Sequence, residues 1–442
     1  MSGRLFWEVV WDRFDPGRPP ESGQHRASRT SGPGIAILRD LTRPFGSPHL
    51  LLCGPPGCGK STELVRIAEG RADDDLVIHL DLAAFLDHVV QDPGALQRLV
   101  SWEIAFLLGL ALVHVGETLP GFAWDPKLLL GLGRAWKGLS DRPGDTEPEI
   151  VPLARRVPVL VSARVRGAGL DQLGGPSQSG AWPLALGGRS EVPTQDPRVR
   201  NLAALLRRMV DTLRVQRPVL LVLDGLDHLS DEARLRGLLF DSGLIADLPC
   251  GQLVAAPMGL RRGDETRASS RYSVHTLYNE SILDPAAPAH HGPGIEIFSE
   301  IFRQRTADLA EAPEEILEEP LIRRLAYHCG GRLRDFSAAL RLIAERAWDE
   351  DLGMIPPTLV AEVLDRQRRQ LEAGLDASHI SLLRNVVLDP LHALPHDAEA
   401  EALLRDGRLL VYSGDTEWYF PHTLLLVQRI KLRQTTSAPN LP

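Results

Sequence analysis

The sequence contains little lysine and little cysteine. Only four of its 49 basic residues are lysines, and all the others are arginines. Its four cysteines form no C-x-x-C pair: Cys53, Cys58, Cys250 and Cys329. Their spacing argues against a zinc site and against a disulfide framework, and it is typical of a protein from a reducing compartment.

Long apolar runs are also missing. The most apolar stretch, residues 104–115, is shorter than the roughly 20 residues that a membrane-spanning helix needs, so we interpret it as a buried helix. The first residues of the chain lack the apolar core of a signal peptide. We therefore expect a soluble, cytoplasmic protein.

The chain has no excess of positive charge. Its formal net charge is −9 and its isoelectric point is about 5.9, which argues against non-specific nucleic-acid binding as the main role. The hydrophobic content of 43% and the charged content of 24% are those of an ordinary globular protein. A length of 442 residues is enough for about two to three domains.

Residues 54–61 carry a phosphate-binding motif. They read Gly-Pro-Pro-Gly-Cys-Gly-Lys-Ser, which matches G-x-x-x-x-G-K-S, the P-loop or Walker A motif, at every position. An apolar stretch typical of a buried strand precedes the motif at 49–53, and a helical pattern follows it at 61–69. The predicted nucleotide-binding residues are Gly54, Pro55, Pro56, Gly57, Cys58, Gly59, Lys60, Ser61 and Thr62.

This motif predicts binding of ATP and Mg²⁺. The glycines let several backbone N–H groups point at one phosphate, and the start of the following helix adds partial positive charge. Lys60 is expected to reach the β- and γ-phosphates, and the Ser61 hydroxyl is expected to ligate Mg²⁺.

A second apolar strand supplies an acid for the metal. Residues 219–224 form a continuous apolar run that ends in Asp224, which we expect to hold Mg²⁺ through water. Asp227, three positions later, is placed to orient or deprotonate the attacking water. Asp81 also ends an apolar run, at 76–81, and is the alternative to Asp224 as the metal acid.

The chain divides into four parts by composition. We expect an N-terminal segment at 1–34, docked and followed by a loop, and a core at 35–294. A helical region is expected at 295–350 and a separate C-terminal unit at 355–435. Residues 141–200 are rich in proline and glycine, and we interpret them as an insertion with an edge strand or hairpin within 157–166 and a mobile loop around Gly174 to Gly188. Residues 284–294 are expected to be a flexible joint before the helical region.

Together these motifs resemble those of the AAA+/STAND group of P-loop ATPases. The resemblance rests on the Walker A motif at 54–61, the strand at 219–224 and the pattern Asp224-x-x-Asp227. This group belongs to the ASCE division and is related to NLR-type and origin-recognition-type ATPases. The resemblance implies an α/β fold: a P-loop parallel sheet with helices on both faces, then a helical lid and a C-terminal winged helix.

The resemblance also implies roles for residues outside the core. The run at 329–335 is similar to the G-x-x-R at the start of a lid helix, which would make Arg334 a sensor 2 that reaches the γ-phosphate, with Arg332 as the next candidate. Residues 380–430 resemble a winged helix with a turn at 413–415. In that comparison His422 would contact the β-phosphate in an inactive state. A purely structural role for His422 is equally expected.

Two departures from the group bear on turnover. The strand at 253–256 ends in Ala-Ala-Pro, which offers no polar side chain where the group has sensor 1. No clear arginine finger is present, and Arg261 and Arg262 are weak candidates. These departures imply slow hydrolysis, typical of a switch rather than a motor.

The expected function is therefore a slowly hydrolysing ATPase that acts as a nucleotide-dependent switch in a bacterial signalling or defence (conflict) system. Its expected partners are an effector protein and other copies of itself in a nucleotide-dependent oligomer. One alternative is a nucleic-acid-remodelling AAA+ protein, against which residues 355–435 carry a net charge of −2. The other is a nucleotide-bound scaffold that does not hydrolyse ATP.

Overall fold

The chain forms two compact units. The first comprises Met1–Gly32, Gly54–Thr62 and Leu277–Pro442, and the second comprises Pro33–Cys53 and Glu63–Thr276. The computed structural model describes residues 3–17, 32–43, 47–140, 142, 144–162, 182–263, 271–284, 287–309, 313–395, 397–426 and 429–430. Among these residues, no helix has both the length and the apolar character that crossing a membrane requires.

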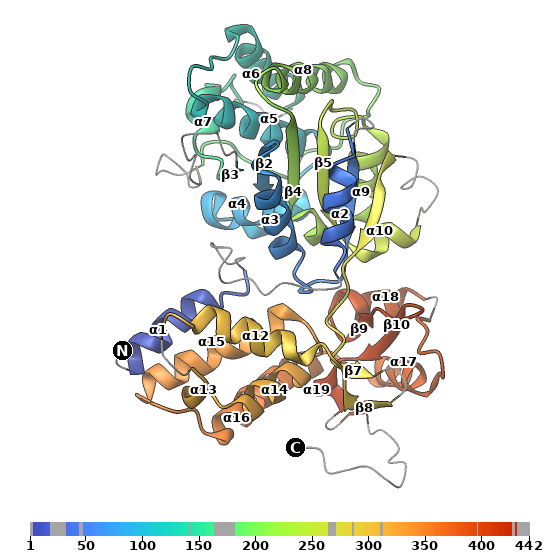
Figure 1. The fold of residues 1–442 in the computed structure, drawn as a ribbon. Helices are drawn as coiled ribbons and strands as arrows, with labels where there is room; N and C mark the ends of the chain where they lie inside the picture. Colours follow the sequence, from blue (N-terminus) through green and yellow to red (C-terminus); the bar gives the residue numbers. More distant parts are fainter. Residues whose placement is uncertain are drawn as a thin grey trace. The chain divides into compact units, whose positions relative to one another are not determined.

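The second unit is built on a six-stranded sheet (Figure 1). Its strands are β1 (His49–Cys53), β2 (Leu76–Asp81), β3 (Val159–Ser162), β4 (Val219–Asp224), β5 (Gly251–Ala256) and β6 (Ser273–Thr276). They lie in the order β3-β2-β4-β5-β1-β6. All neighbouring pairs are parallel except β2 and β3, which are antiparallel. The parallel α/β fold predicted from the sequence is confirmed.

The central strands are continuous apolar runs because helices cover the sheet. Every residue of β4 is buried, and so is every residue of β2 except its last. Helices α4 and α8 contact β4, α5 contacts β2 and β3, and α10 contacts β1. The α-helices of this unit are α2 (Gly34–Leu41), α3 (Lys60–Arg71, which begins in the first unit), α4 (Leu82–Phe85), α5 (Ser101–Thr118), α6 (Pro126–Leu139), α7 (Ile150–Ala154), α8 (Pro197–Arg214), α9 (Glu232–Arg236) and α10 (Met258–Gly263). Shorter helical turns are η2 (Leu86–Val90), η3 (Pro93–Arg98), η4 (Leu226–His228) and η5 (Gly237–Asp241).

The proline- and glycine-rich insertion supplies the edge strand that its pattern predicted. β3 pairs with β2 and stands at the end of the sheet. Further along, Arg189 is buried between Glu103 and Asp145, with its Nη2 donating to Asp145 over 2.9 Å. This ion-paired guanidinium fastens the described end of the insertion to α5. Of the loop predicted at 174–188, residues 174–181 lie outside the described residues.

The strand β6 was not predicted. Its sequence, Ser-Val-His-Thr, is short and mostly polar, and its side chains are exposed or half-buried. It pairs with β1 at the other edge of the sheet, where a strand has one neighbour and needs no continuous apolar run.

The first unit is mainly helical. Its α-helices are α1 (Gly3–Arg13), α12 (Ile295–Thr306), α13 (Pro313–Ile316), α14 (Glu319–His328), α15 (Leu333–Asp349), α16 (Pro357–Glu372), α17 (Ala377–Leu388), α18 (Ala398–Arg405) and α19 (Thr423–Leu426). Two antiparallel hairpins accompany them: β7 (Leu283–Asp284) with β8 (Ala287–His291), and β9 (Leu409–Tyr412) with β10 (Trp418–Pro421).

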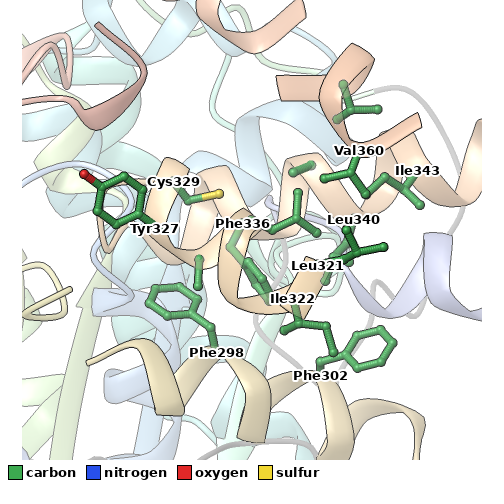
Figure 2. Close-up of a cluster of buried hydrophobic side chains, with 14 of the residues drawn as sticks. Phe298, Phe302, Leu321, Ile322, Tyr327, Cys329, Phe336, Leu340, Ile343 and Val360 are labelled. Carbon is green, nitrogen blue, oxygen red and sulfur yellow. The ribbon is translucent and has the colours of Figure 1, made fainter. Parts of the chain in front are cut away.

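Four helices share one apolar core (Figure 2). Phe298 comes from α12, Ile322 from α14, Leu340 from α15 and Val360 from α16, and all four are fully buried. Helix α16 therefore packs with the helices predicted at 295–350, although the sequence analysis had begun a separate unit at 355. Burial of a side chain of this size stabilises the fold by about 1.5–3 kcal/mol.

The expected docked N-terminal segment is the helix α1, which adds to the same core. Phe6, Trp7, Val10 and Phe14 are all buried. These positions follow the i, i+1, i+4, i+8 spacing of one helix face. The indole Nε1 of Trp7 donates to the carbonyl oxygen of Leu352 over 2.9 Å, so the polar atom of this buried ring is satisfied.

The joint expected at 284–294 is instead part of a hairpin. β7 and β8 pair, the N–H of Gly292 donates to Ile282 (2.8 Å), and the N–H of Gly294 donates to Ser281 (2.9 Å). The described residues of this stretch are therefore paired, and its role as a flexible joint stays a prediction. Proline, alanine and glycine suggested a loop by composition, but the chain folds back on itself and pairs its backbone there.

The C-terminal elements occur in the order that the winged-helix prediction requires. Helices α17 and α18 are followed by the hairpin of β9 and β10, in which Tyr412 pairs with Trp418 across the predicted turn. All four residues of each strand are buried. Assignment of these elements to the winged-helix class stays a prediction.

We expect Trp7→Ala to lower the free energy of unfolding of the first unit by about 3–5 kcal/mol, because it empties a core position and leaves the Leu352 carbonyl without its donor. Trp11, one turn further on the same helix, is 41% exposed, so Trp11→Ala is the matched control. Urea denaturation followed by circular dichroism measures both. Equal effects of the two substitutions would show that α1 is not docked through Trp7.

Candidate nucleotide site

The P-loop adopts a conformation that its glycines permit. Gly57 and Gly59 have φ values of 83° and 99°, in the left-handed region that residues with a side chain rarely adopt. A Cβ on Gly57 would lie 2.9 Å from the Cβ of Arg334. The motif therefore has glycine here for two reasons, backbone conformation and close packing.

Lys60 lies inside this loop. Its side chain is buried, and its Nζ donates to the carbonyl oxygens of Gly54 (2.8 Å) and Pro55 (2.9 Å). Lys60 is also the first residue of α3, a helix of 12 residues, so the loop continues into a helix N-terminus. The ammonium group and the helix start are the two features that favour a bound phosphate. Ser61 and Thr62 follow in the first turn and are half-buried.

The predicted lid run contacts the P-loop within the first unit. The guanidinium of Arg332 donates to the carbonyl oxygen of Pro56 through Nε (3.2 Å) and Nη2 (3.1 Å). The backbone N–H of Arg334 donates to the carbonyl oxygen of Gly57 over 3.2 Å. The sequence analysis had predicted that Arg334 reaches the γ-phosphate, with Arg332 as the next candidate for that role. In the structure it is the Arg332 side chain that is bonded to the loop, and the sensor role of Arg334 stays a prediction.

Arg332 also contacts two residues, Asp335 and Gly407, to which the sequence analysis gave no role. Its Nη1 donates to the Asp335 carboxylate over 2.7 Å. It also packs on Gly407, where a Cβ would lie 2.5 Å from Nη1. The spacing of Arg332 and Asp335, i and i+3 at the start of a helix, was the signal available in the sequence. Nothing in the sequence indicated Gly407.

His422 lies on the far side of Asp335. Its ring is fully buried, Nε2 is 3.1 Å from Asp335 Oδ2, and Nδ1 accepts from the N–H of Leu424 over 3.3 Å. Burial lowers the pKa of His422, although Asp335 opposes the shift, and the two partners then fit a neutral ring protonated on Nε2. Burial by itself would raise the pKa of Asp335, but Arg332 and His422 outweigh it and the pKa is lowered. His422 therefore contacts helix α15 through the Asp335 carboxylate.

The two aspartates weighed as metal acids are neighbours in the second unit. Asp81 and Asp224 are register partners at the ends of β2 and β4. Asp224 is buried and accepts the N–H of Gly225 over 2.8 Å, and Asp81 caps α4 by accepting the N–H of Ala84 over 2.9 Å. Burial and the negative charge of Asp224 raise the pKa of Asp81 to about 6. Two adjacent, partly desolvated carboxylates suit a divalent cation, since its charge would favour their ionised forms.

His79 lies close behind this pair. Its Nε2 is 3.9 Å from Asp224 Oδ2, and its ring nitrogens make no hydrogen bond to any described residue. Burial lowers the pKa of His79, so the ring is neutral near pH 7. Asp227 is half-buried on η4, just beyond the end of β4.

The P-loop and the two aspartates each follow or end a strand of the same sheet. β5 lies between β1 and β4, and β1, β2, β4 and β5 are parallel, so all of them end at the same edge of the sheet. Asp81 and Asp224 are at that edge, and the residue after β1 is Gly54, the first of the P-loop. A single strand, β5, thus separates the P-loop strand β1 from β4, the strand that ends in Asp224.

The end of β5 offers no polar side chain, as the sequence indicated. Ala255 and Ala256 are both buried. Of the two weak arginine-finger candidates, Arg261 donates through Nη1 to the Thr276 hydroxyl over 3.1 Å within the second unit. The side chain of Arg262 lies outside the described residues.

A parallel sheet whose strand runs into a G-x-x-x-x-G-K-S loop and then a helix defines a P-loop α/β protein. No protein-family model and no curated protein matches the chain. Solved structures do resemble it. Aeropyrum pernix Orc1 in complex with DNA is 13% identical with a TM-score of 0.40, over 96% of this chain and 97% of that one. Cdc6p from Pyrobaculum aerophilum is 14% identical with a TM-score of 0.40, over 93% of each chain. The Thermotoga maritima RuvB branch migration motor is 15% identical with a TM-score of 0.25, over 43% of this chain and 63% of that one.

We expect Asp81→Asn to stabilise the protein at pH 8 in the presence of EDTA. The folded-state pKa of about 6 is above the ordinary aspartate value, so the wild type loses stability as pH rises from about 4 through 6, and the substitution removes that loss. Asparagine also caps helices as well as aspartate. Thermal unfolding should show a larger gain at pH 8 than at pH 5, because pH 5 lies inside the range over which the wild type loses stability.

The matched control is Asp231→Asn. Asp231 also caps a helix of the second unit, by accepting the N–H of Arg234 over 3.0 Å, but it faces an arginine rather than a carboxylate. It should give no gain at pH 8. If Asp81→Asn is no more stable than wild type at pH 8, the two carboxylates do not repel each other as described.

Proposed function

We propose that this protein is an ATP-binding, slowly hydrolysing ATPase of the AAA+/STAND kind that works as a nucleotide-dependent switch. The observation that carries the proposal is the double contact between the P-loop and the start of α15. Arg332 bonds to Pro56 and the Arg334 N–H bonds to Gly57. A loop built to bind phosphate is thus directly attached to the helical part of the first unit.

In this proposal the P-loop N–H groups and Lys60 bind the phosphates of ATP. Ser61 and Asp224 would hold Mg²⁺, with Asp81 beside Asp224 adding negative charge. The cation would neutralise charge on the phosphates when bound. Asp227 would orient or deprotonate the attacking water. Absence of a polar side chain at the end of β5 favours slow turnover, because no group there helps to position that water.

The switch would work through hydrogen bonds from the loop to the C-terminal hairpin. A phosphate that draws the loop N–H groups toward itself also reorients the adjoining peptide planes, and the carbonyl of Pro56 is one of these. Arg332 would follow its acceptor, and Asp335 and His422 would follow Arg332. A bound nucleotide can shift such an equilibrium only as far as it prefers one arrangement of these contacts over the other.

The setting proposed for this switch is a bacterial signalling or defence system with a separate effector. This part is supported by the motif resemblance alone. The main rival is nucleic-acid remodelling, which the predicted C-terminal winged helix would allow. Fluorescence anisotropy with labelled duplex DNA, with and without ATP, separates the two. Salt-sensitive submicromolar binding would favour the rival.

We expect Lys60→Ala to weaken ATP·Mg²⁺ binding about 10- to 100-fold, since a buried charge-assisted contact to phosphate is lost. Lys127→Ala is the control, because Lys127 is an exposed lysine on α6. Isothermal titration calorimetry with ATP and with a non-hydrolysable analogue gives both affinities. A phosphate-release assay on the same samples distinguishes slow turnover from a scaffold that does not hydrolyse ATP. Unchanged affinity in Lys60→Ala would contradict the site.

We expect Arg332→Ala and Arg334→Ala to fail in different ways. Arg332 contacts a carbonyl, so its loss should leave ATP affinity within about threefold but abolish the ATP-induced change in hydrogen exchange at residues 418–426. Arg334→Ala should instead make the ATP and ADP exchange patterns converge, as the sensor prediction requires. Arg346→Ala, an exposed arginine of the same helix, is the control. An unaltered nucleotide response in Arg332→Ala would refute the proposed connection.

A further inference from the structure

A groove runs between α1 and α15 in the first unit. Its volume is about 250 Å³. Three kinds of residue line it: tryptophans, carboxylates and a small side chain that leaves room between them. They are Trp7, Glu8, Trp11, Ala344, Glu345, Trp348 and Asp349. None of these residues takes part in the nucleotide site described above.

Two of the tryptophans are exposed in a way that packing does not explain. Trp11 is 41% exposed and Trp348 is 44% exposed, whereas Trp7 beneath them is 1% exposed. Indole rings are among the most costly side chains to leave in water, and gathered exposed aromatics mark binding surfaces. Both rings border the groove.

The carboxylates of the groove have no cation of their own. Among the described residues, Glu8, Glu345 and Asp349 make no hydrogen bond or ion pair, and all three are exposed. Their neighbour Glu350 is paired with Arg346 over 3.3 Å, as is usual for acids in this arginine-rich chain. The groove therefore has three negative charges that no side chain neutralises by direct contact.

The same indole rings already accept guanidinium groups from the chain itself. Arg341 lies over Trp11, 3.7 Å from the ring centroid, and Arg4 lies over Trp348 at 5.3 Å. Asp15 and Asp351 hold these two arginines in place by ion pairs of 3.1 Å and 3.5 Å. An indole has two faces, so an arginine on one face leaves the ring able to take part in a second contact.

We propose that this groove binds the guanidinium group of an arginine presented by a partner protein. A planar guanidinium stacks on indole and donates to carboxylates in a fork, so it matches both chemistries of the lining better than the compact ammonium of lysine does. The volume is below that of a typical site for a drug-sized ligand, so a single side chain is the fitting occupant. The proposal is independent of nucleotide binding and holds equally for Lys60→Ala.

The test uses the full chain labelled with 5-fluorotryptophan. Its eight tryptophans give eight ¹⁹F signals, which Trp→Phe substitutions assign. Titration with acetyl-arginine amide should shift the signals of Trp11 and Trp348 saturably and leave those outside the groove unmoved. Acetyl-citrulline amide, which has nearly the same shape without the charge, should cause no saturable shift. Acetyl-lysine amide should bind more weakly.

Substitution of the lining provides the second readout. Glu345→Gln should weaken acetyl-arginine amide binding about two- to fivefold, and higher salt should weaken it further. Glu350→Gln on the same helix is the matched control and should have no effect, because Glu350 is already paired. The proposal is overturned if no saturable shift occurs, if citrulline or lysine amide binds as well as arginine amide, or if Glu345→Gln binds like wild type.

Discussion

The arrangement of the P-loop and α15 in the first unit depends on the hydrogen-bond partners of one buried guanidinium group. Arg332 is 7% exposed, and a charge so withdrawn from water must be paired and hydrogen-bonded. It finds the Asp335 carboxylate on its own helix and the Pro56 carbonyl on the P-loop. Removal of either partner would leave a buried charge with too few acceptors. The helix, the loop and the hairpin that carries His422 are therefore fixed by the same electrostatic requirement.

In the second unit the corresponding constraint is repulsion. Parallel pairing of β2 and β4 brings Asp81 and Asp224 to equivalent positions, and burial makes their mutual charge costly. The strands themselves gain stability from apolar side chains packed on both faces of the sheet. This gain outweighs the repulsion of one pair of carboxylates at the edge. Such a pair is more stable with a cation beside it than without one. A cation bound beside this pair would therefore stabilise the unit.

The sequence predicted the features that follow from local patterns. The strands β1, β2, β4 and β5 are apolar runs, and the P-loop is a motif of adjacent residues. What it missed depends on backbone pairing and side-chain direction, which composition and spacing do not reveal. β6 is too short and polar to be seen alone, and the joint at 284–294 looked like a loop by composition although its backbone is paired. The hydrogen bonds from the Arg332 guanidinium to the P-loop depend on which way this side chain leaves the start of α15, and spacing does not determine that.

Gly407 shows how far the residues that support the candidate nucleotide site extend along the chain. It precedes the hairpin of β9 and β10, has a φ of 71°, and leaves no room for a Cβ beside the Arg332 guanidinium. A larger residue there would displace Arg332 from Pro56 without altering any residue of the Walker motif. Natural variants at this C-terminal glycine would then share the phenotype expected of Arg332→Ala, in which nucleotide affinity is kept but the response to it is lost. A genetic screen for loss of nucleotide response should therefore recover lesions at both ends of the chain.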